Sequence, residues 1–152
     1  MVRNILLNSG LLGLCLLAAW GTRFLDQWFG FMNFQSLWSI IVGGFFILFG
    51  LIFRCWATAN YYKHQLRVLE LRAQRQLVTS GPFHYTRNPL YVGIMALWLG
   101  AVLIFGTVVG ALLVITLYVF IDVWLRFFEE KDLEKKFGNE YRDYVKAAPR
   151  WL

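Results

Sequence analysis

The chain has 152 residues, of which 59% are hydrophobic and only 16% are charged, and its mean hydropathy is +0.53. Soluble domains carry roughly 25% charged residues, so this chain has too little charge to cover a water-exposed surface. The formal net charge is +6, but the basic residues lie between apolar runs, which is typical of membrane proteins and argues against a nucleic-acid partner. The length fits one domain over residues 1–152.

Four apolar segments are each near the roughly 17–25 residues that a helix needs to cross a bilayer. An arginine precedes the first segment, as in a signal peptide, but no small-residue cleavage site follows, so we interpret that segment as a helix too. The predicted fold class is therefore an all-α integral membrane protein with about four transmembrane helices. These spans cover about residues 5–20, 37–53, 89–105 and 107–125.

The last two segments form one run, and almost no charge lies in the 40 residues between Pro89 and Phe128. As a single helix this run would be about 60 Å long, twice the hydrocarbon thickness of a bilayer. It must fold back, and Gly106-Thr107 is the natural hinge. We expect a helical hairpin whose two outer ends emerge on the same membrane face.

Lysine and arginine residues indicate the orientation. They concentrate between the second and third segments and after the fourth, whereas the loop between the first two segments has only Arg23 and Asp26. The positive-inside rule then predicts a cytoplasmic middle loop, a cytoplasmic C-terminal segment over 126–152 and, with four spans, two cytoplasmic termini. The membrane would be the plasma membrane in a bacterium and the endoplasmic reticulum in a eukaryote.

Polar side chains gather at two places that the hairpin should bring together. The first is the loop over residues 79–91, where Gly81-Pro82 is a turn signal and Pro89 suits the first position of a helix. The free N–H groups of that helix end favour an anion. The second place is the end of the fourth segment, with Asp122, Arg126, Glu129 and Glu130. Ionisable residues such as these are costly at membrane depth and usually have a function.

Structural interpretations of the same residues remain open. Asp122, Arg126 and Glu130 are spaced by four residues and could form an ion ladder that only anchors one helix face. Further on, apolar residues recur at helical spacing among charges, and Gly138 is expected to interrupt them. This amphipathic stretch would either lie on the membrane surface or close over a pocket. Its apolar residues are Leu133, Phe137, Tyr141 and Tyr144.

Both places resemble a known family. Residues 81–93, with Arg87-Asn88-Pro89-Leu90-Tyr91 at their centre, are similar to the Arg-His-Pro-x-Tyr signature of the isoprenylcysteine carboxyl methyltransferase and phospholipid methyltransferase superfamily. Residues 129–144 resemble its second signature, which begins with two glutamates. The resemblance covers about residues 77–152. The chain departs from the family at Asn88, where His is usual, and an amide cannot carry a proton.

The resemblance implies a membrane methyltransferase that uses S-adenosylmethionine, with a cytoplasmic cofactor pocket roofed by the C-terminal segment. A lipid or lipidated acceptor would enter from the bilayer. Arg87 suits the carboxylate of the cofactor and a glutamate suits its ammonium or ribose, so Arg87 and Glu130 are the expected catalytic pair. No metal is expected, because neither cysteine has partners at ligand spacing. The cofactor walls implied are His84, Tyr85, Arg87, Asn88, Pro89 and Tyr91 on one side, and Glu129 and Glu130 on the other.

The acceptor stays open between an isoprenylcysteine carboxylate and a phospholipid head-group amine. A carboxylate is already a nucleophile, whereas an amine must first lose a proton, for which Glu130 is the candidate. Two other functions remain. One is an NADPH-dependent membrane reductase of the sterol-reductase type, which has a similar C-terminal pattern in generally longer chains. The other is a non-catalytic lipid-binding membrane protein.

Overall fold

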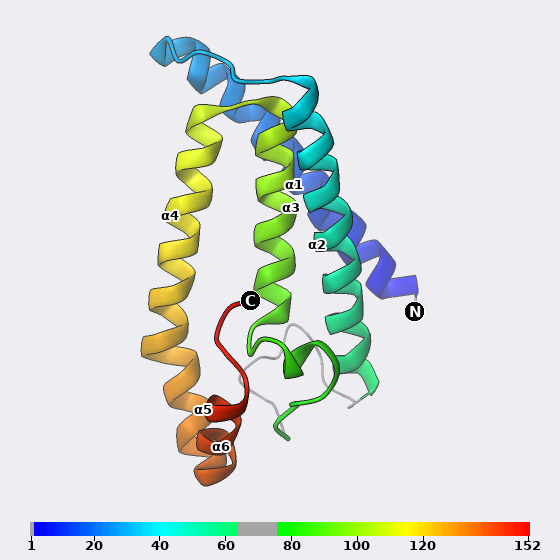
Figure 1. The fold of residues 1–152 in the computed structure, drawn as a ribbon, viewed down its shortest axis with the longest axis vertical. Helices are drawn as coiled ribbons and strands as arrows, with labels where there is room; N and C mark the ends of the chain where they lie inside the picture. Colours follow the sequence, from blue (N-terminus) through cyan, green and yellow to red (C-terminus); the bar gives the residue numbers. More distant parts are fainter. Residues whose placement is uncertain (1, 64–75) are drawn as a thin grey trace.

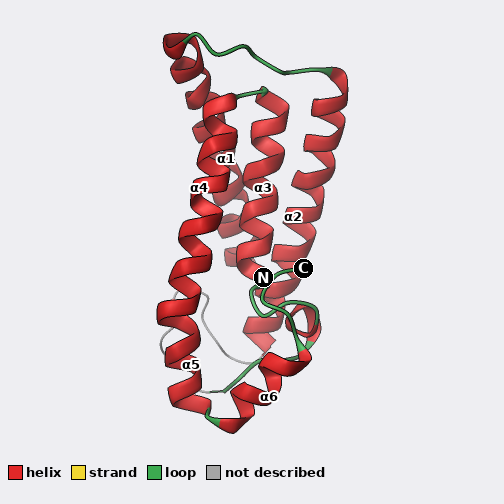
Figure 2. Ribbon diagram, turned by 60° about the vertical axis from the view of Figure 1, so that its left-hand side comes forward, coloured by secondary structure: helices red, strands yellow, loops and turns green. Residues whose placement is uncertain are grey.

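The computed structural model describes residues 2–63 and 76–152 (Figure 1), with side chains from residue 8 onward. Within these residues every regular element is helical (Figure 2), which confirms the predicted all-α class. Most of the basic middle loop predicted to be cytoplasmic lies outside the described residues. The helices are α1 Val2–Phe29, α2 Leu37–Lys63, α3 Pro89–Phe105, α4 Val108–Trp124, α5 Glu130–Phe137 and α6 Asn139–Ala147, with a 3-10 turn, η2 Gly81–His84, and a π-helical turn, η3 Leu125–Glu129.

The four predicted apolar segments lie in helices, although the first, second and fourth helices are longer than predicted. Among the described residues, two helices are long and apolar enough to cross a membrane, Leu37–Lys63 and the continuous helix Val108–Phe137. Helix α3 is a shorter apolar helix, and its bounds are those of the predicted third segment. Crossing by four helices stays a prediction.

Helices α2 and α3 pack closely because glycines face each other along their contact. A Cβ atom on Gly43 would lie 2.7 Å from the carbonyl oxygen of Gly100, and one on Gly50 would lie 2.8 Å from the carbonyl oxygen of Gly93. Such small residues let two backbones approach in lipid, where van der Waals packing replaces the hydrophobic effect as the main attraction. Among the described helices, α2 and α3 are therefore the most extensively packed pair.

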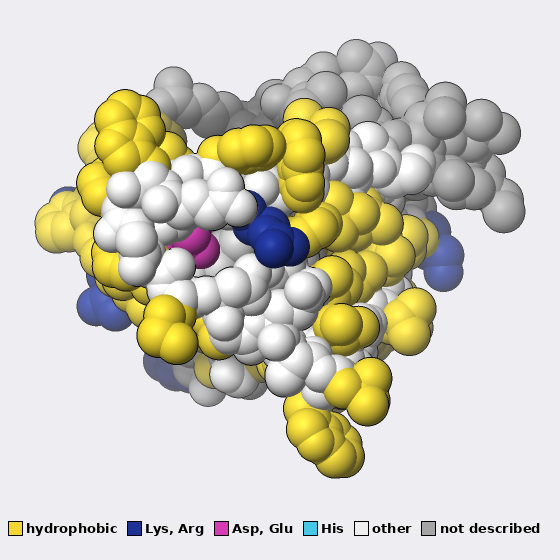
Figure 3. All heavy atoms as spheres, turned by 90° about the horizontal axis from the view of Figure 1, so that it is seen from above, with side chains coloured by type: hydrophobic (Ala, Val, Ile, Leu, Met, Phe, Trp, Pro, Cys, Tyr) yellow, Lys and Arg dark blue, Asp and Glu magenta, His cyan; other side chains and the backbone are white. Residues whose placement is uncertain are grey.

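The hinge between α3 and α4 is held by the loop that joins α1 to α2. Gly106 adopts a left-handed φ of 63°, as a helix-ending glycine does. Its carbonyl accepts a hydrogen bond from Phe34 N–H at 3.1 Å, and the Asn33 amide donates to Phe105 O at 3.1 Å. Figure 3 looks down on this end, where a small charged area lies among backbone and other polar atoms, with hydrophobic side chains further out.

Asp26 of α1, which the sequence suggested only as a loop charge, caps the N-terminus of α4. Its carboxylate accepts hydrogen bonds from the backbone N–H groups of Val108 at 2.9 Å and Val109 at 2.8 Å. Beside it, the hydroxyls of Thr22 and Thr107 lie 3.0 Å apart. A negative charge at a helix N-terminus satisfies free donors and favourably meets the helix dipole. These contacts fix α4 to α1 at the end far from the predicted site.

Replacing Asp26 with alanine should destabilise the protein by about 0.5–2 kcal/mol, because two backbone donors of α4 lose their partner. Denaturant unfolding in detergent micelles measures the effect. The adjacent Gln27→Ala is the control, since the Gln27 side chain is exposed and no cap depends on it. Equal stability of the two variants would show that water replaces the cap without cost.

At the other end, the amphipathic stretch packs on the loop that leads into α3. Gly138, with a φ of 55°, ends α5 and separates it from α6, so the predicted interruption is confirmed. Tyr141 and Tyr144 are buried against Phe83 and Leu90, and the Tyr144 hydroxyl donates to Phe83 O at 2.7 Å. The apolar face of the stretch therefore covers the loop.

Candidate functional site

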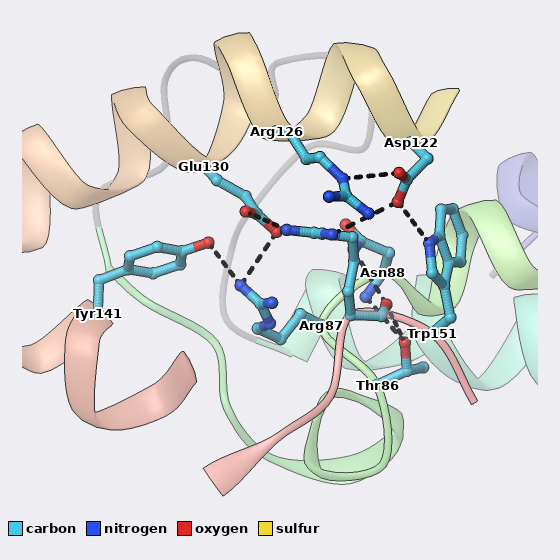
Figure 4. Close-up of polar contacts among 9 residues, drawn as sticks. Thr86, Arg87, Asn88, Asp122, Arg126, Glu130, Tyr141 and Trp151 are labelled. Carbon is cyan, nitrogen blue, oxygen red and sulfur yellow. Dashed lines mark hydrogen bonds and ion pairs between the residues drawn. The ribbon is translucent and has the colours of Figure 1, made fainter. Parts of the chain in front are cut away.

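The two polar clusters predicted from the hairpin are neighbours in the structure (Figure 4). An oxygen of Glu130, at the start of α5, lies 3.0 Å from Nη1 of Arg87, in the loop before α3. The side chains are 10% and 19% exposed, so the ion pair is largely shielded from water. The same Arg87 nitrogen donates to the Tyr141 hydroxyl at 3.1 Å. Loop, α5 and α6 thus converge on one guanidinium group.

A second guanidinium group, that of Arg150, enters from the segment after α6. Its Nε and Nη2 donate to the two oxygens of Glu130 at 2.7 and 2.8 Å, a bidentate pair, and these hydrogen bonds raise the pKa of Arg150. Its backbone carbonyl accepts from the Thr86 hydroxyl at 2.7 Å and from the Asn88 amide at 3.1 Å. The C-terminal segment is therefore fastened both to the loop and to α5.

Asp122 extends the network along α4. Its carboxylate accepts hydrogen bonds from Arg126 Nε at 2.7 Å and from the Trp151 indole at 2.9 Å, and lies 3.5 Å from an Arg150 nitrogen. Asp122 thus holds the end of the C-terminal segment against α4, where the ring of Trp151 also contacts Tyr118 at 5.3 Å between centroids.

The π-helical turn explains why Glu130 points to the loop. The Glu130 N–H donates to the carbonyl of Leu125, five residues earlier, so this turn contains one residue more than an α-helical turn. The extra residue rotates Glu130 relative to Arg126, and no ion pair joins these two in the described part of the chain. The ion ladder considered from the sequence is therefore wrong beyond Asp122–Arg126, which does pair.

A third contact between the hairpin ends joins Tyr91 to Glu129. The Tyr91 hydroxyl donates to the Glu129 carboxylate at 3.3 Å, from the first turn of α3 to the end of the π turn. Two successive glutamates therefore have different partners. Glu130 is engaged by two guanidinium groups, whereas Glu129 has only a neutral hydroxyl among the side chains that the structure describes.

His84 and Tyr85 lie apart from this network. Both are exposed, with ring centroids 5.5 Å from each other, and Tyr85 also contacts Trp56 at 6.0 Å. Pro89 is buried at the first turn of α3, as its position suggested. The contact of His84 and Tyr85 with a cofactor stays a prediction, because none of their described contacts reaches the ion pairs.

Sequence reasoning missed two members of the network, Arg150 and Trp151, and placed Thr86 in the polar loop without giving it a role. Tyr141 was recognised only as an apolar position of the amphipathic stretch. A signal for the first two exists, since a lone arginine and a tryptophan directly follow Pro149 and the end of an amphipathic helix. Thr86 carries no such signal, because its hydroxyl contacts a backbone carbonyl 64 residues away.

Among the ion pairs of the described residues, Arg87, Arg126 and Arg150 oppose Asp122 and Glu130, and a further carboxylate, that of Glu129, lies next to Glu130 in the chain. One donor of this network lacks a partner, because Nε of Arg87 is buried without a hydrogen bond. An unpaired buried donor is costly, so this atom favours an added anionic acceptor such as a carboxylate.

Tyr141 supplies a further donor at the same point. Burial, together with the negative charge of Glu130, raises the pKa of Tyr141, so its hydroxyl keeps its proton at neutral pH. Since the oxygen accepts from Arg87, that proton remains available to a bound group.

Comparison with known proteins gives a family and one relative. Residues 38–140 match the family described as phospholipid methyltransferase. Methanethiol S-methyltransferase 1 of Bradyrhizobium diazoefficiens is 40% identical over 63 residues, a stretch that covers 41% of this chain and 21% of that protein. The match thus spans about a fifth of the relative's length. No solved structure matches the chain.

Proposed function

Because the chain belongs to the phospholipid methyltransferase family, as its match over residues 38–140 shows, we propose that it transfers a methyl group from S-adenosylmethionine to a lipophilic acceptor. The transfer takes place at the cytoplasmic face of a membrane. The contact of 3.0 Å between Arg87 and Glu130 carries this proposal, because it joins the two signature segments at one shielded point. The family and the relative are methyltransferases, so they do not favour the reductase.

The residues of the site fit the cofactor. Its carboxylate needs a cation, and Arg87 has a buried donor without a partner. Its ammonium and ribose hydroxyls need acceptors, and Glu129 and Glu130 lie side by side. When bound, S-adenosylmethionine supplies an electrophilic methyl group on a sulfonium. Arg87 and Tyr141 orient the carboxylate, Glu130 holds the cationic end, and the segment around Arg150 covers the site against water.

The protein accelerates the transfer by positioning two reactants rather than by acid–base chemistry. If the acceptor is an amine, however, a carboxylate must take its proton. The sequence suggested Glu130 for this role, but Glu130 already binds Arg87 and Arg150. Glu129, bonded to the Tyr91 hydroxyl, is the better candidate. The sides of α3 and α4 that meet the bilayer next to Glu129 supply the apolar surface for the acceptor.

The relative's name points to a second acceptor class, a small thiol. Incubating membranes that contain the protein with S-adenosylmethionine labelled in its methyl group distinguishes the two. We expect label in the lipid extract, and little in dimethyl sulfide when methanethiol is added. If label appears only in dimethyl sulfide, the acceptor is a small thiol and the proposal of a lipid acceptor is wrong. The absence of both, in a folded protein that S-adenosylhomocysteine does not stabilise, would favour the non-catalytic alternative.

We also propose that both termini and the loop between α2 and α3 face the cytoplasm, since that loop and the C-terminal segment carry most of the basic residues. Reporter fusions at each terminus should be active only on the cytoplasmic side. A C-terminus on the opposite side would contradict a cytoplasmic site, because the C-terminal segment is part of the network of Asp122 and Glu130.

A further inference from the structure

Arg54 of α2 is a cation at the junction of α1, α2 and α3. Its Nε donates to the Asn8 side-chain oxygen at 2.8 Å, and its Nη1 donates to Leu90 O at 3.1 Å. Both partners are neutral, and no acidic residue pairs with Arg54 in the described part of the chain. A partly buried cation without a counter-ion is costly in a membrane protein, and such residues usually have a function.

The guanidinium group of Arg54 still has donors to offer. It carries five N–H bonds, and the two contacts with Asn8 and Leu90 use only some of them. The hydrogen bonds described for Arg54 use Nε and Nη1 and leave Nη2 without one. In the described residues, the buried atoms without a partner are Arg87 Nε and Trp98 Nε1, so Nη2 of Arg54 is not buried. The free edge of Arg54 is therefore accessible. A planar fork of this kind matches the oxygens of a phosphate.

The position of Arg54 along α2 is near the level of lipid phosphates. Arg54 follows Leu37, the first residue of α2, by 17 residues, which is about 26 Å along a helix axis. The hydrocarbon core is about 30 Å thick, so Arg54 lies near its boundary if α2 crosses from its first residue. The nearby apolar side chains Ile52 and Trp56 are 69% and 44% exposed, as expected for a surface that faces lipid.

Helix α3 separates Arg54 from the methyl-transfer site. A Cβ atom on Gly93 would lie 2.7 Å from Cβ of Arg54, so this side of α3 faces Arg54. Tyr91, two residues earlier, reaches Glu129. Two residues correspond to about 200° around an α-helix, so the two contacts lie on nearly opposite sides of α3. A ligand at Arg54 is consequently not the reacting group of the acceptor.

We propose that Arg54 binds the phosphodiester of a bilayer phospholipid that is not the methyl acceptor. The lipid lies against α1 and α2 and completes the hydrogen bonding of the guanidinium group. Because the site carries one positive charge without a counter-ion, an anionic lipid such as phosphatidylglycerol binds better than zwitterionic phosphatidylcholine.

Native mass spectrometry of the protein in a non-ionic detergent tests this site with the two lipids in identical acyl chains. The wild type should bind one phosphatidylglycerol at a concentration about ten-fold below that for phosphatidylcholine, as a charge-assisted pair predicts. The Asn8→Asp variant tests whether the unpaired charge of Arg54 causes this lipid preference. It is nearly isosteric, places a carboxylate next to Arg54 Nε, and should abolish the ten-fold preference while the helices persist.

Three further variants separate binding from packing. Arg54→Gln removes the charge but keeps a donor, so it should also lose the preference. Asn8→Ala keeps the cation and should retain it. Arg126→Gln removes another arginine that is paired and more than half exposed, and should retain it as well.

Wild-type preference in a folded Asn8→Asp protein would overturn the proposal, as would an equal loss in Arg126→Gln, which would indicate general surface charge. If Arg54→Gln does not fold, Asn8→Asp alone gives the answer. The measurement contains no S-adenosylmethionine, so its outcome is independent of the proposed methyl transfer.

Discussion

Glu130→Gln is expected to weaken the binding of S-adenosylhomocysteine by about ten-fold to over a hundred-fold. Hydrogen bonds to a charged group contribute about 1.5–3 kcal/mol, and 1.4 kcal/mol is a factor of ten in affinity. Arg87→Met should have an effect of the same size, because it removes the cation that would hold the cofactor carboxylate. Calorimetric titration of the detergent-purified variants measures both affinities, and circular dichroism measures helix content.

Controls separate cofactor contact from the structural role of the network. Glu134→Gln changes the same residue type on α5, but Glu134 is about half exposed and pairs with the exposed Arg142, so its affinity should equal that of the wild type. Arg150→Gln breaks the bidentate contact with Glu130 while keeping the carboxylate. If Arg150→Gln and Glu130→Gln lose affinity equally, Glu130 acts by fastening the C-terminal segment. Wild-type affinity in folded Arg87→Met and Glu130→Gln proteins would exclude both residues from the site.

Gly43→Ala is expected to destabilise the helix bundle by about 1–3 kcal/mol, as overpacking of a close contact does. The new methyl group would lie 2.7 Å from the carbonyl oxygen of Gly100 and 2.8 Å from a side-chain carbon of Ile104. A backbone carbonyl cannot rotate away, so α2 and α3 must separate. This cost exceeds the gain of up to about 1 kcal/mol that alanine brings over glycine in a helix.

The neighbouring Gly44→Ala provides a matched control for this substitution. A Cβ atom on Gly44 has nothing within 4 Å, so only the gain in helix propensity remains and stability should be unchanged or slightly higher. Thermal unfolding of both variants in the same detergent gives the comparison. Equal unfolding temperatures would mean that the contact between α2 and α3 is looser than the structure describes.

The hairpin could be predicted from sequence because two simple constraints determine it. A run of 40 residues with almost no charge is too long for one crossing, and Gly106 is the residue at which it can turn. The cap that Asp26 forms on α4 was not predictable, because the two partners are 82 residues apart and a single aspartate in a loop carries no pattern.

The same distinction applies to the candidate site. The hairpin predicts that Arg87 and Glu130 meet, because it brings its two ends together. The sequence does not predict which groups they bind, because a π turn at Leu125–Glu129 changes the direction of Glu130 and has no simple sequence signature. Arg150 was missed for a related reason, since the path of the last residues depends on contacts with Thr86 and Asn88.

The hydrogen bonds around Gly106 have a mechanical consequence. The turn of the hairpin is clamped by Asn33 and Phe34, and α4 is fixed there to Asp26. With the turn fixed in this way, α3 and α4 separate more easily at their other ends, which the ion pair of Arg87 with Glu130 and the hydrogen bond of Tyr91 to Glu129 join. Under the proposed function, a lipid tail that lies between α3 and α4 would therefore find the easier separation at that end, next to the charges that would bind the cofactor.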